Sequence, residues 1–173
     1  MKTHRSVRTL AFALGVLAAA SSPAFGQGPV PSGETVNGIS CDAQEGQRIH
    51  IHMHLVIVDR LQRVDIPARI GIPEGKRCIY WLHTHTSDGI LHIEAPQNRS
   101  FTLGDFFAVW GQPLTLTSAA SARAHGGNVR VWVNGHEYPR DPRTVPLVAH
   151  ADIWIQVGPP YAKPKAFTAW NGL

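Results

Sequence analysis

An Asp-Gly turn signal between two runs of alternating apolar and polar residues is the strongest constraint on the fold of this chain. Residues 80–94 read YWLHTHTSDGILHIE, an apolar strand pattern that is broken once, at Asp88-Gly89. Because Gly accepts the positive φ of a type I′ turn, Asp-Gly between two alternating runs predicts a β-hairpin. We therefore expect residues 77–86 and 90–95 to pair as antiparallel strands.

The length of this turn decides which side chains face one another. With a two-residue turn, His85 faces His92, and His83 faces Glu94, all on one face of the hairpin. A four-residue loop keeps the same face but opposes His83 to His92 and Trp81 to Glu94. A three-residue loop with a bulge would shift the parity and separate the two halves of this polar set.

A second group of imidazoles lies upstream, in the sequence IHIHMHLVIV of residues 49–58. Strict alternation places His50, His52 and His54 on one face of a strand. The opposite face is aliphatic and is expected to enter the core through Ile49, Ile51, Met53, Leu55 and Ile57. Six His and one Glu within about 45 residues, all on strand-like alternation, predict a metal site rather than isolated solvated imidazoles.

The residue types indicate which metal is bound. Imidazole with one carboxylate suits Zn and Cu, the main candidates outside the cytoplasm, and we expect one ion per chain. Glu94 is either a ligand or a catalytic base that acts on metal-bound water. The predicted metal ligands are His52, His54, His83, His85 and His92.

The N-terminal segment 1–26 has the three parts of a secretory signal peptide. Basic residues precede an apolar run of residues 10–20, and small residues, Ala24 and Gly26, end the segment. The run is too short for a membrane span, which needs about 20 residues. We therefore expect an exported protein, secreted or periplasmic, without a membrane span.

The charge argues against a nucleic-acid partner. The first 26 residues carry Lys2, Arg5 and Arg8 and no acidic residue, so their removal lowers the formal net charge from +4 to +1. The remaining Lys and Arg are scattered along the chain rather than gathered in a basic stripe. The expected partner is a metal ion.

The two cysteines fit an oxidising compartment. Cys41 and Cys78 are the only ones in the chain, and an even pair in an exported protein predicts a disulfide. A metal-bound thiolate is the alternative.

Many short strands and one short helix predict the fold class. Expected strands cover 47–58, 64–72, 77–86, 90–95, 128–133, 136–138 and 151–157, with a helix over 103–110, a loop over 118–127 and turns at Asn134-Gly135 and Asp141-Pro142-Arg143. This pattern is typical of an all-β single domain, either a β-sandwich, a jelly roll or a small barrel with one short helix. The expected segments are a signal peptide (1–26), a flexible lead (27–40), a His-rich β domain (41–158) and an extended tail (159–173).

Whole phrases of the chain resemble an uncharacterised family of exported bacterial proteins. These phrases follow the patterns HxHxH at 50–54, YWLHTHxxDGxxHxE at 80–94 and FTLGxFF at 101–107. A looser similarity, in ligand types only, links the chain to cupin-type and carbonic-anhydrase-type sites, which use His-x-His with a later His. The later His residues here are His125, His136 and His150.

Three function classes follow from these patterns. The first is an exported protein that binds Zn or Cu at its His-rich face. The second is a metal-dependent hydrolytic or oxidative enzyme with Glu94 as base. The third is a structural or adhesion module that binds no metal. A site closed by protein ligands favours the first class, whereas an open coordination position beside a pocket favours the second.

Overall fold

Strand β2 (Ile49–Asp59) is the longest strand and pairs along both of its edges. The computed structural model describes residues 33–173. On one edge β2 pairs antiparallel with β6 (Ile90–Ala95), and on the other edge it pairs in parallel with β11 (Asp152–Val157). The predicted signal peptide, residues 1–26, and the first part of the predicted flexible lead, residues 27–32, lie outside the described residues.

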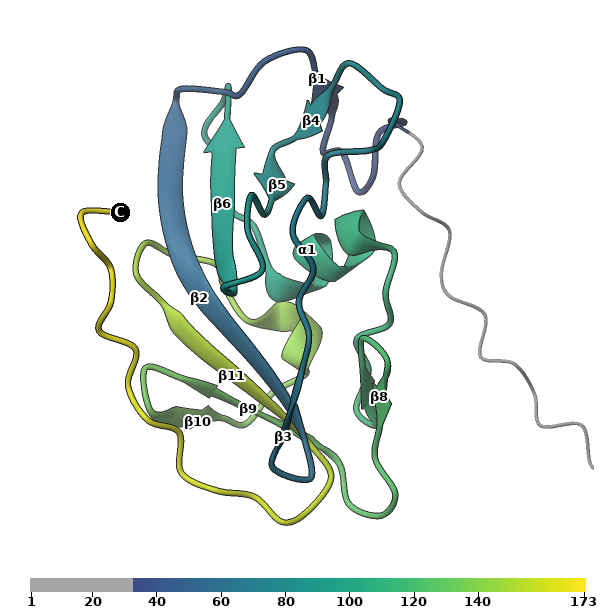
Figure 1. Ribbon diagram of the computed structural model, residues 1–173, viewed down its shortest axis with the longest axis vertical. Coiled ribbons are helices and arrows are strands. Elements are labelled where there is room, and N and C mark those ends of the chain that lie inside the picture. The colour runs from purple at the N-terminus through teal and green to yellow at the C-terminus, as the bar shows by residue number, and fades with distance from the viewer. Residues whose placement is uncertain (1–32) are drawn as a thin grey trace, which may run out of the picture.

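The main sheet has seven strands in the order β10-β9-β11-β2-β6-β5, with β3 (Gln62–Val64) paired to the far end of β2. Its remaining members are β9 (Val129–Val133), β10 (His136–Tyr138) and β5 (Leu82–His83). Two smaller sheets join β1 (Cys41–Asp42) to β4 (Ile79–Tyr80) and β7 (Ser118–Ala119) to β8 (Ala122–Arg123). The expected all-β domain is confirmed, with a mixed main sheet (Figure 1).

The predicted helix, α1, runs over Leu103–Trp110 and is the only α-helix among residues 33–173. Thr102 accepts a hydrogen bond from the Asp105 backbone N–H, and the Asp105 side chain accepts one from the Thr102 backbone, so a capping box starts the helix. Gly104 is required there because a Cβ would lie 2.9 Å from the Arg143 carbonyl oxygen. The helix therefore packs closely against η1 (Pro142–Thr144).

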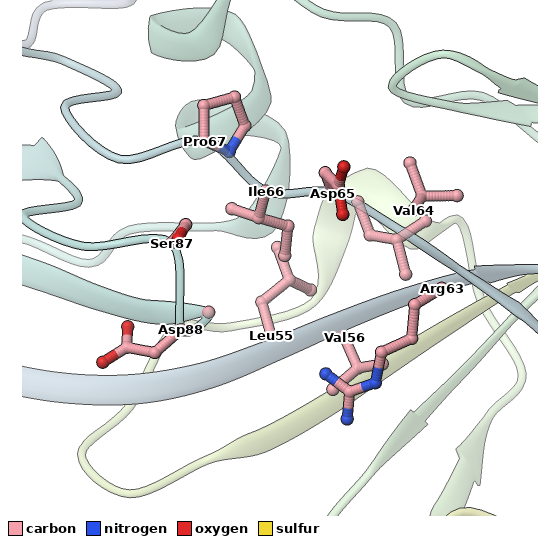
Figure 2. Close-up of a pocket in the computed structure, with 11 residues that line it drawn as sticks. Leu55, Val56, Arg63, Val64, Asp65, Ile66, Pro67, Ser87 and Asp88 are labelled. Atoms are coloured by element: carbon pink, nitrogen blue, oxygen red, sulfur yellow. The ribbon is translucent and has the colours of Figure 1, made fainter.

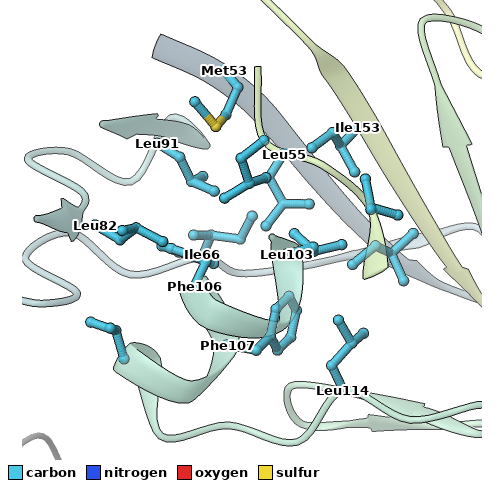
Figure 3. Close-up of a cluster of buried hydrophobic side chains, with 14 of the residues drawn as sticks. Met53, Leu55, Ile66, Leu82, Leu91, Leu103, Phe106, Phe107, Leu114 and Ile153 are labelled. Carbon is cyan, nitrogen blue, oxygen red and sulfur yellow. The ribbon is translucent and has the colours of Figure 1, made fainter. Parts of the chain in front are cut away.

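The hydrophobic core lies between the main sheet and α1. Phe106 and Phe107 of the helix are buried against aliphatic side chains of β2, β5, β6 and β11 (Figure 3). The central members are fully buried, and burying each such side chain stabilises the fold by about 1.5–3 kcal/mol. They include Met53, Leu55, Leu82, Leu91, Ile93, Leu103 and Ile153.

The two predicted hairpin turns differ in outcome. Asn134 and Gly135 both have positive φ, at 52° and 78°, and join β9 to β10 as expected of a type I′ turn. At the first turn only Gly89 has positive φ, and the Asp88 side chain accepts a hydrogen bond from the Ile90 N–H. The two-residue turn is therefore not formed.

The first hairpin instead has the register of the longer loop. His83 lies opposite His92, and the Glu94 N–H donates to the Trp81 carbonyl. The physical reason lies in the segment after β5, where the Thr84 N–H bonds to the Ile70 carbonyl rather than to β6. Strand β5 therefore ends at His83.

Three expected elements differ from the structure. The strand expected over 64–72 is limited to β3, which ends at Val64, and residues 65–72 form no strand before or after Pro67. The loop expected over 118–127 contains the short β7–β8 hairpin. The strand expected over 77–86 is divided between β4 and β5, which belong to different sheets.

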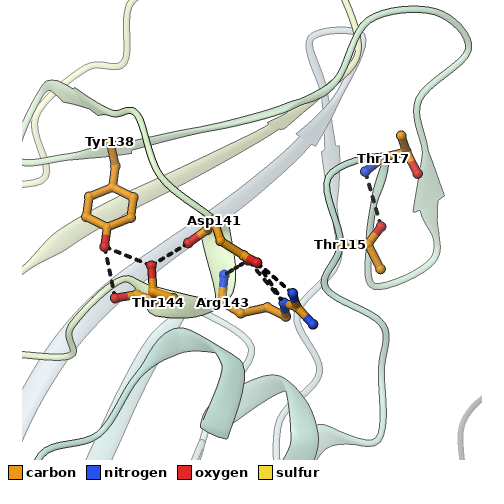
Figure 4. Close-up of polar contacts among 6 residues, drawn as sticks. All are labelled: Thr115, Thr117, Tyr138, Asp141, Arg143 and Thr144. Atoms are coloured by element: carbon orange, nitrogen blue, oxygen red, sulfur yellow. Dashed lines mark hydrogen bonds and ion pairs between the residues drawn. The ribbon is translucent and has the colours of Figure 1, made fainter.

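The predicted turn at 141–143 begins the short 3-10 helix η1. The Asp141 carboxylate accepts hydrogen bonds from the backbone and guanidinium of Arg143, and this pairing lowers the pKa of Asp141 to about 2 (Figure 4). The Tyr138 hydroxyl donates to the Thr144 carbonyl at 3.0 Å. These contacts fix the return of the chain from β10 towards β11.

The segment after β11, residues 158–173, crosses the face of the sheet opposite α1 (Figure 1). It contains no regular secondary structure, and its backbone bonds to the sheet through side chains. The Phe167 N–H donates to Asp152, and Gln156 exchanges two hydrogen bonds with the backbone of Ala162. No helix within residues 33–173 is long and apolar enough to cross a membrane.

The predicted disulfide is present. Cys41 and Cys78 are bonded, and the bond joins β1 to the segment just before β4, across a sequence separation of 37 residues. It therefore ties the two strands of the small β1–β4 sheet together covalently.

Loss of this bond is expected to destabilise the domain. Closing a loop of this length is worth roughly 3–4 kcal/mol in the chain-entropy model, so Cys41→Ala with Cys78→Ala should lower Tm by on the order of 10 °C. Differential scanning calorimetry of the variant beside the wild type measures this shift. Two titratable thiols in the native, unreduced wild type would contradict the assignment.

Candidate metal centre

The candidate site is a cluster of five imidazoles and one carboxylate on three neighbouring strands and the segment just after β5. His50 of β2 lies opposite Glu94 of β6. His52 lies opposite His92 from one side of β6, and His83 of β5 lies opposite His92 from the other side. The complete set is His50, His52, His83, His85, His92 and Glu94.

The donor atoms of this cluster form two overlapping groups. The β5 group consists of His83, His85, His92 and Glu94, and the β2 group consists of His50, His52, His92 and Glu94. Within each group one donor atom per residue lies within 4.8 Å of all the others. His92 and Glu94 belong to both groups because β6 runs between β2 and β5.

Within the β5 group, the His83 ring is oriented as a metal ligand needs to be. His83 Nδ1 lies 2.9 Å from the Tyr80 carbonyl oxygen, which only accepts hydrogen bonds and therefore places the proton on Nδ1. The lone pair of His83 then points from Nε2 into the cluster. This Nε2 is 3.2 Å from His85 Nε2 and 3.9 Å from Glu94 Oε2.

Two buried atoms of the cluster have no hydrogen-bond partner. These atoms are His92 Nδ1 and Glu94 Oε2. Glu94 is only 4% exposed, and the neighbouring His83 is fully buried. An unpaired buried polar atom costs about 1–3 kcal/mol, and more when it belongs to a charged group. A bound cation is a direct physical reason to retain both atoms.

Burial also sets the protonation of the cluster. It is the main cause that lowers the pKa of His83 to about 4 and that of His92 to about 3, with the neighbouring imidazoles adding to the effect. Both rings are therefore neutral at pH 7 and keep the lone pair that binds metal. Burial first, and the Glu45 carboxylate second, raise the pKa of Glu94 to about 7.

His54, a predicted ligand, is not brought into the cluster. On β2 it lies opposite Ile90, and on its other side it pairs with Asp152 of β11. His54 Nδ1 is 2.8 Å from Asp152 Oδ1, and the imidazole stacks on Phe167 at a centroid distance of 3.8 Å. The other predicted residues, His52, His83, His85, His92 and Glu94, all lie in the cluster.

The later His residues also lie elsewhere. His125 and His136 are exposed and belong to neither group. His150 lies with its Nε2 2.7 Å from the Leu173 carbonyl oxygen and its ring against Trp170.

The predicted set missed one member of the cluster and one carboxylate beside it. His50 takes the position that was expected for His54, because β6 reaches His50 with Glu94 but presents only Ile90 to His54. Glu45 Oε1 lies 3.6 Å from His85 Nε2 and comes from the loop between β1 and β2. Alternation already placed His50 on the correct face, whereas no pattern in the sequence indicated Glu45.

Two clefts lie away from the cluster. One of about 510 Å³ is lined by β2, β3 and the loop that precedes β6, including Arg63, Asp65 and Asp88 (Figure 2). Another of about 540 Å³ lies beside β3 and Ser121. Neither is lined by any of the six cluster residues.

No family model, curated protein or solved structure matches this chain.

Replacement of Glu94 is expected to stabilise the metal-free protein at high pH. The folded pKa of Glu94 lies above its unfolded value of 4.5, so the native state binds the extra proton, and the stability that this provides is lost as pH rises through about 7. Glu94→Gln removes this loss. The Tm of Glu94→Gln minus that of the wild type, both measured in EDTA, should therefore increase by a few degrees between pH 5 and pH 8.

The control for this comparison is Glu74→Gln, at an exposed carboxylate in a loop. It should show no such trend. A constant Tm difference between Glu94→Gln and wild type across the pH range would contradict the raised pKa.

Proposed function

We propose that this is an exported protein that binds a Zn(II) or Cu(II) ion at the β5 group. The observation that carries the proposal is the buried pair of unpartnered donor atoms, His92 Nδ1 and Glu94 Oε2, beside the oriented lone pair of His83. A cation bound here would satisfy both atoms at once.

The choice of metal follows from the donors. Three imidazoles and one carboxylate suit Zn(II) and Cu(II), whereas Ca(II) and Mg(II) prefer shells of oxygen ligands. Neutral imidazoles are also required, and burial keeps His83 and His92 neutral well below pH 7.

Binding is favoured over catalysis for a single ion at this group. Four protein donors fill a tetrahedral shell, as in structural and binding sites, whereas catalytic zinc sites keep one position open. The two clefts described above lie away from these residues. Glu94 is therefore assigned as a ligand rather than as a general base.

Export is supported by two features. The segment 1–26 has the composition of a signal peptide, and the Cys41–Cys78 disulfide fits a protein that folds in an oxidising compartment. The periplasm or the extracellular space is the proposed location.

The test is metal binding by untagged mature protein. We expect Zn(II) to raise Tm, since an ion at 100 times its Kd adds about 2.7 kcal/mol of stability. His92→Ala with Glu94→Gln removes the donors common to both groups and should abolish this rise. Elemental analysis after desalting gives the second readout.

The matched control is His125→Ala with His136→Ala, which removes two exposed imidazoles outside the cluster. This variant should bind metal like the wild type. The proposal fails if the wild type shows neither retained metal nor a shift in Tm with Zn(II) or Cu(II).

A further inference from the structure

The cluster offers more donors than one ion can use. Zn(II) in protein sites is almost always four-coordinate, but six residues converge here. Among the described residues they form two groups rather than one, because only within each group do all donor atoms lie within 4.8 Å. A single ion cannot take up both sets.

Each group contains one pair of imidazoles at the spacing of ligands on a shared ion. His83 Nε2 and His85 Nε2 are 3.2 Å apart, and so are His50 Nε2 and His52 Nε2. Two ligand atoms at 2.0–2.1 Å from a tetrahedral ion stand about 3.3–3.4 Å apart. Both pairs are therefore close to the geometry of a bound ion.

The Glu94 carboxylate lies between the two pairs with one oxygen towards each. Oε1 is 3.1 Å from His50 Nε2, and Oε2 is 3.9 Å from His83 Nε2. A carboxylate that faces two ligand pairs in this way is placed to bridge two ions, which in two-metal sites lie about 3.5–4 Å apart. This placement follows from the central position of β6 between β2 and β5 (Figure 1).

We infer that the cluster binds two Zn(II) or Cu(II) ions side by side, bridged by the Glu94 carboxylate. One ion is bound by His83 and His85, and the other by His50 and His52. The inference rests on the proposed function, which requires only the first of these ions.

The remaining donor, His92, completes one of the two shells. It belongs to both groups and is the third imidazole of the proposed β5 site, so we assign it to the ion of the β5 group. Five imidazoles and two carboxylate oxygens give seven donor atoms, and two tetrahedral ions take eight. The ion of the β2 group then keeps one position for water or an external ligand, at the edge where the His50 side chain is 59% exposed.

The experiment counts ions in the wild type and in two pair variants. Metal-free mature protein is titrated with Zn(II) by calorimetry and then desalted for elemental analysis. We expect two ions per chain in the wild type, one in His50→Ala with His52→Ala, and one in His83→Ala with His85→Ala. The control with His125→Ala and His136→Ala should keep two.

A spectroscopic readout tests the bridge itself. In protein loaded with Cu(II), two ions within a few ångströms of each other give a half-field EPR transition, which a single ion cannot give. We expect this signal in the wild type and its loss in both pair variants. Because His50 is exposed, replacing it should leave the fold intact, and circular dichroism checks this for each variant.

The outcomes separate the two proposals. One ion per wild-type chain would overturn the two-ion centre and leave the proposed function standing. No ion would overturn both. Two ions without a half-field signal would overturn the shared carboxylate, since the ions would then lie too far apart.

Discussion

The pairing of β6 with β2 on one side and β5 on the other is the constraint on which the site depends. Backbone hydrogen bonds fix this register, and the register alone puts His52, His92 and His83 in one row across three strands. A slip of one residue would turn the row into the core and the aliphatic residues to the outside. The aliphatic faces of the same strands therefore hold the polar cluster in place.

The cluster has a cost that the rest of the domain offsets. Glu94 and His83 are buried polar groups, and a carboxylate withdrawn from water is stable only when it is protonated or paired with a cation. The core beneath them, with Met53, Leu91 and Ile93 buried, provides the stability that tolerates this arrangement. Groups whose pKa is strongly shifted by burial, as those of His83 and Glu94 are, cluster at functional sites.

The three His side chains of β2 share one face of the sheet but have two different environments. Towards one end of β2, His50 and His52 lie close to Glu94, which also lies close to His83 of β5. Further along, His54 is paired with Asp152 and covered by Phe167 of the C-terminal segment. The change occurs at Ile90, where β6 begins, so the extent of one strand separates a candidate ligand from a structural histidine.

The sequence by itself determined the local elements whose signals are local. The helix expected over 103–110 has the same ends as α1, Asn134-Gly135 predicted a hairpin turn, and alternation predicted β2 and β6 with their faces. These features depend on dihedral preferences and side-chain periodicity within a few residues, which the sequence carries directly.

Only the tertiary structure decided the composition of the site. The loop of the first hairpin was set by contacts of Thr84 with residues near Ile70, and so the register of His83 could not be read from Asp88-Gly89. His50 rather than His54 lies in the cluster, and Glu45 lies beside it. Both facts depend on which strands lie beside β2 and where they end. Alternation fixes the face on which a side chain lies, but its neighbours on that face come from strands far away in the sequence, whose pairing only the packed core selects.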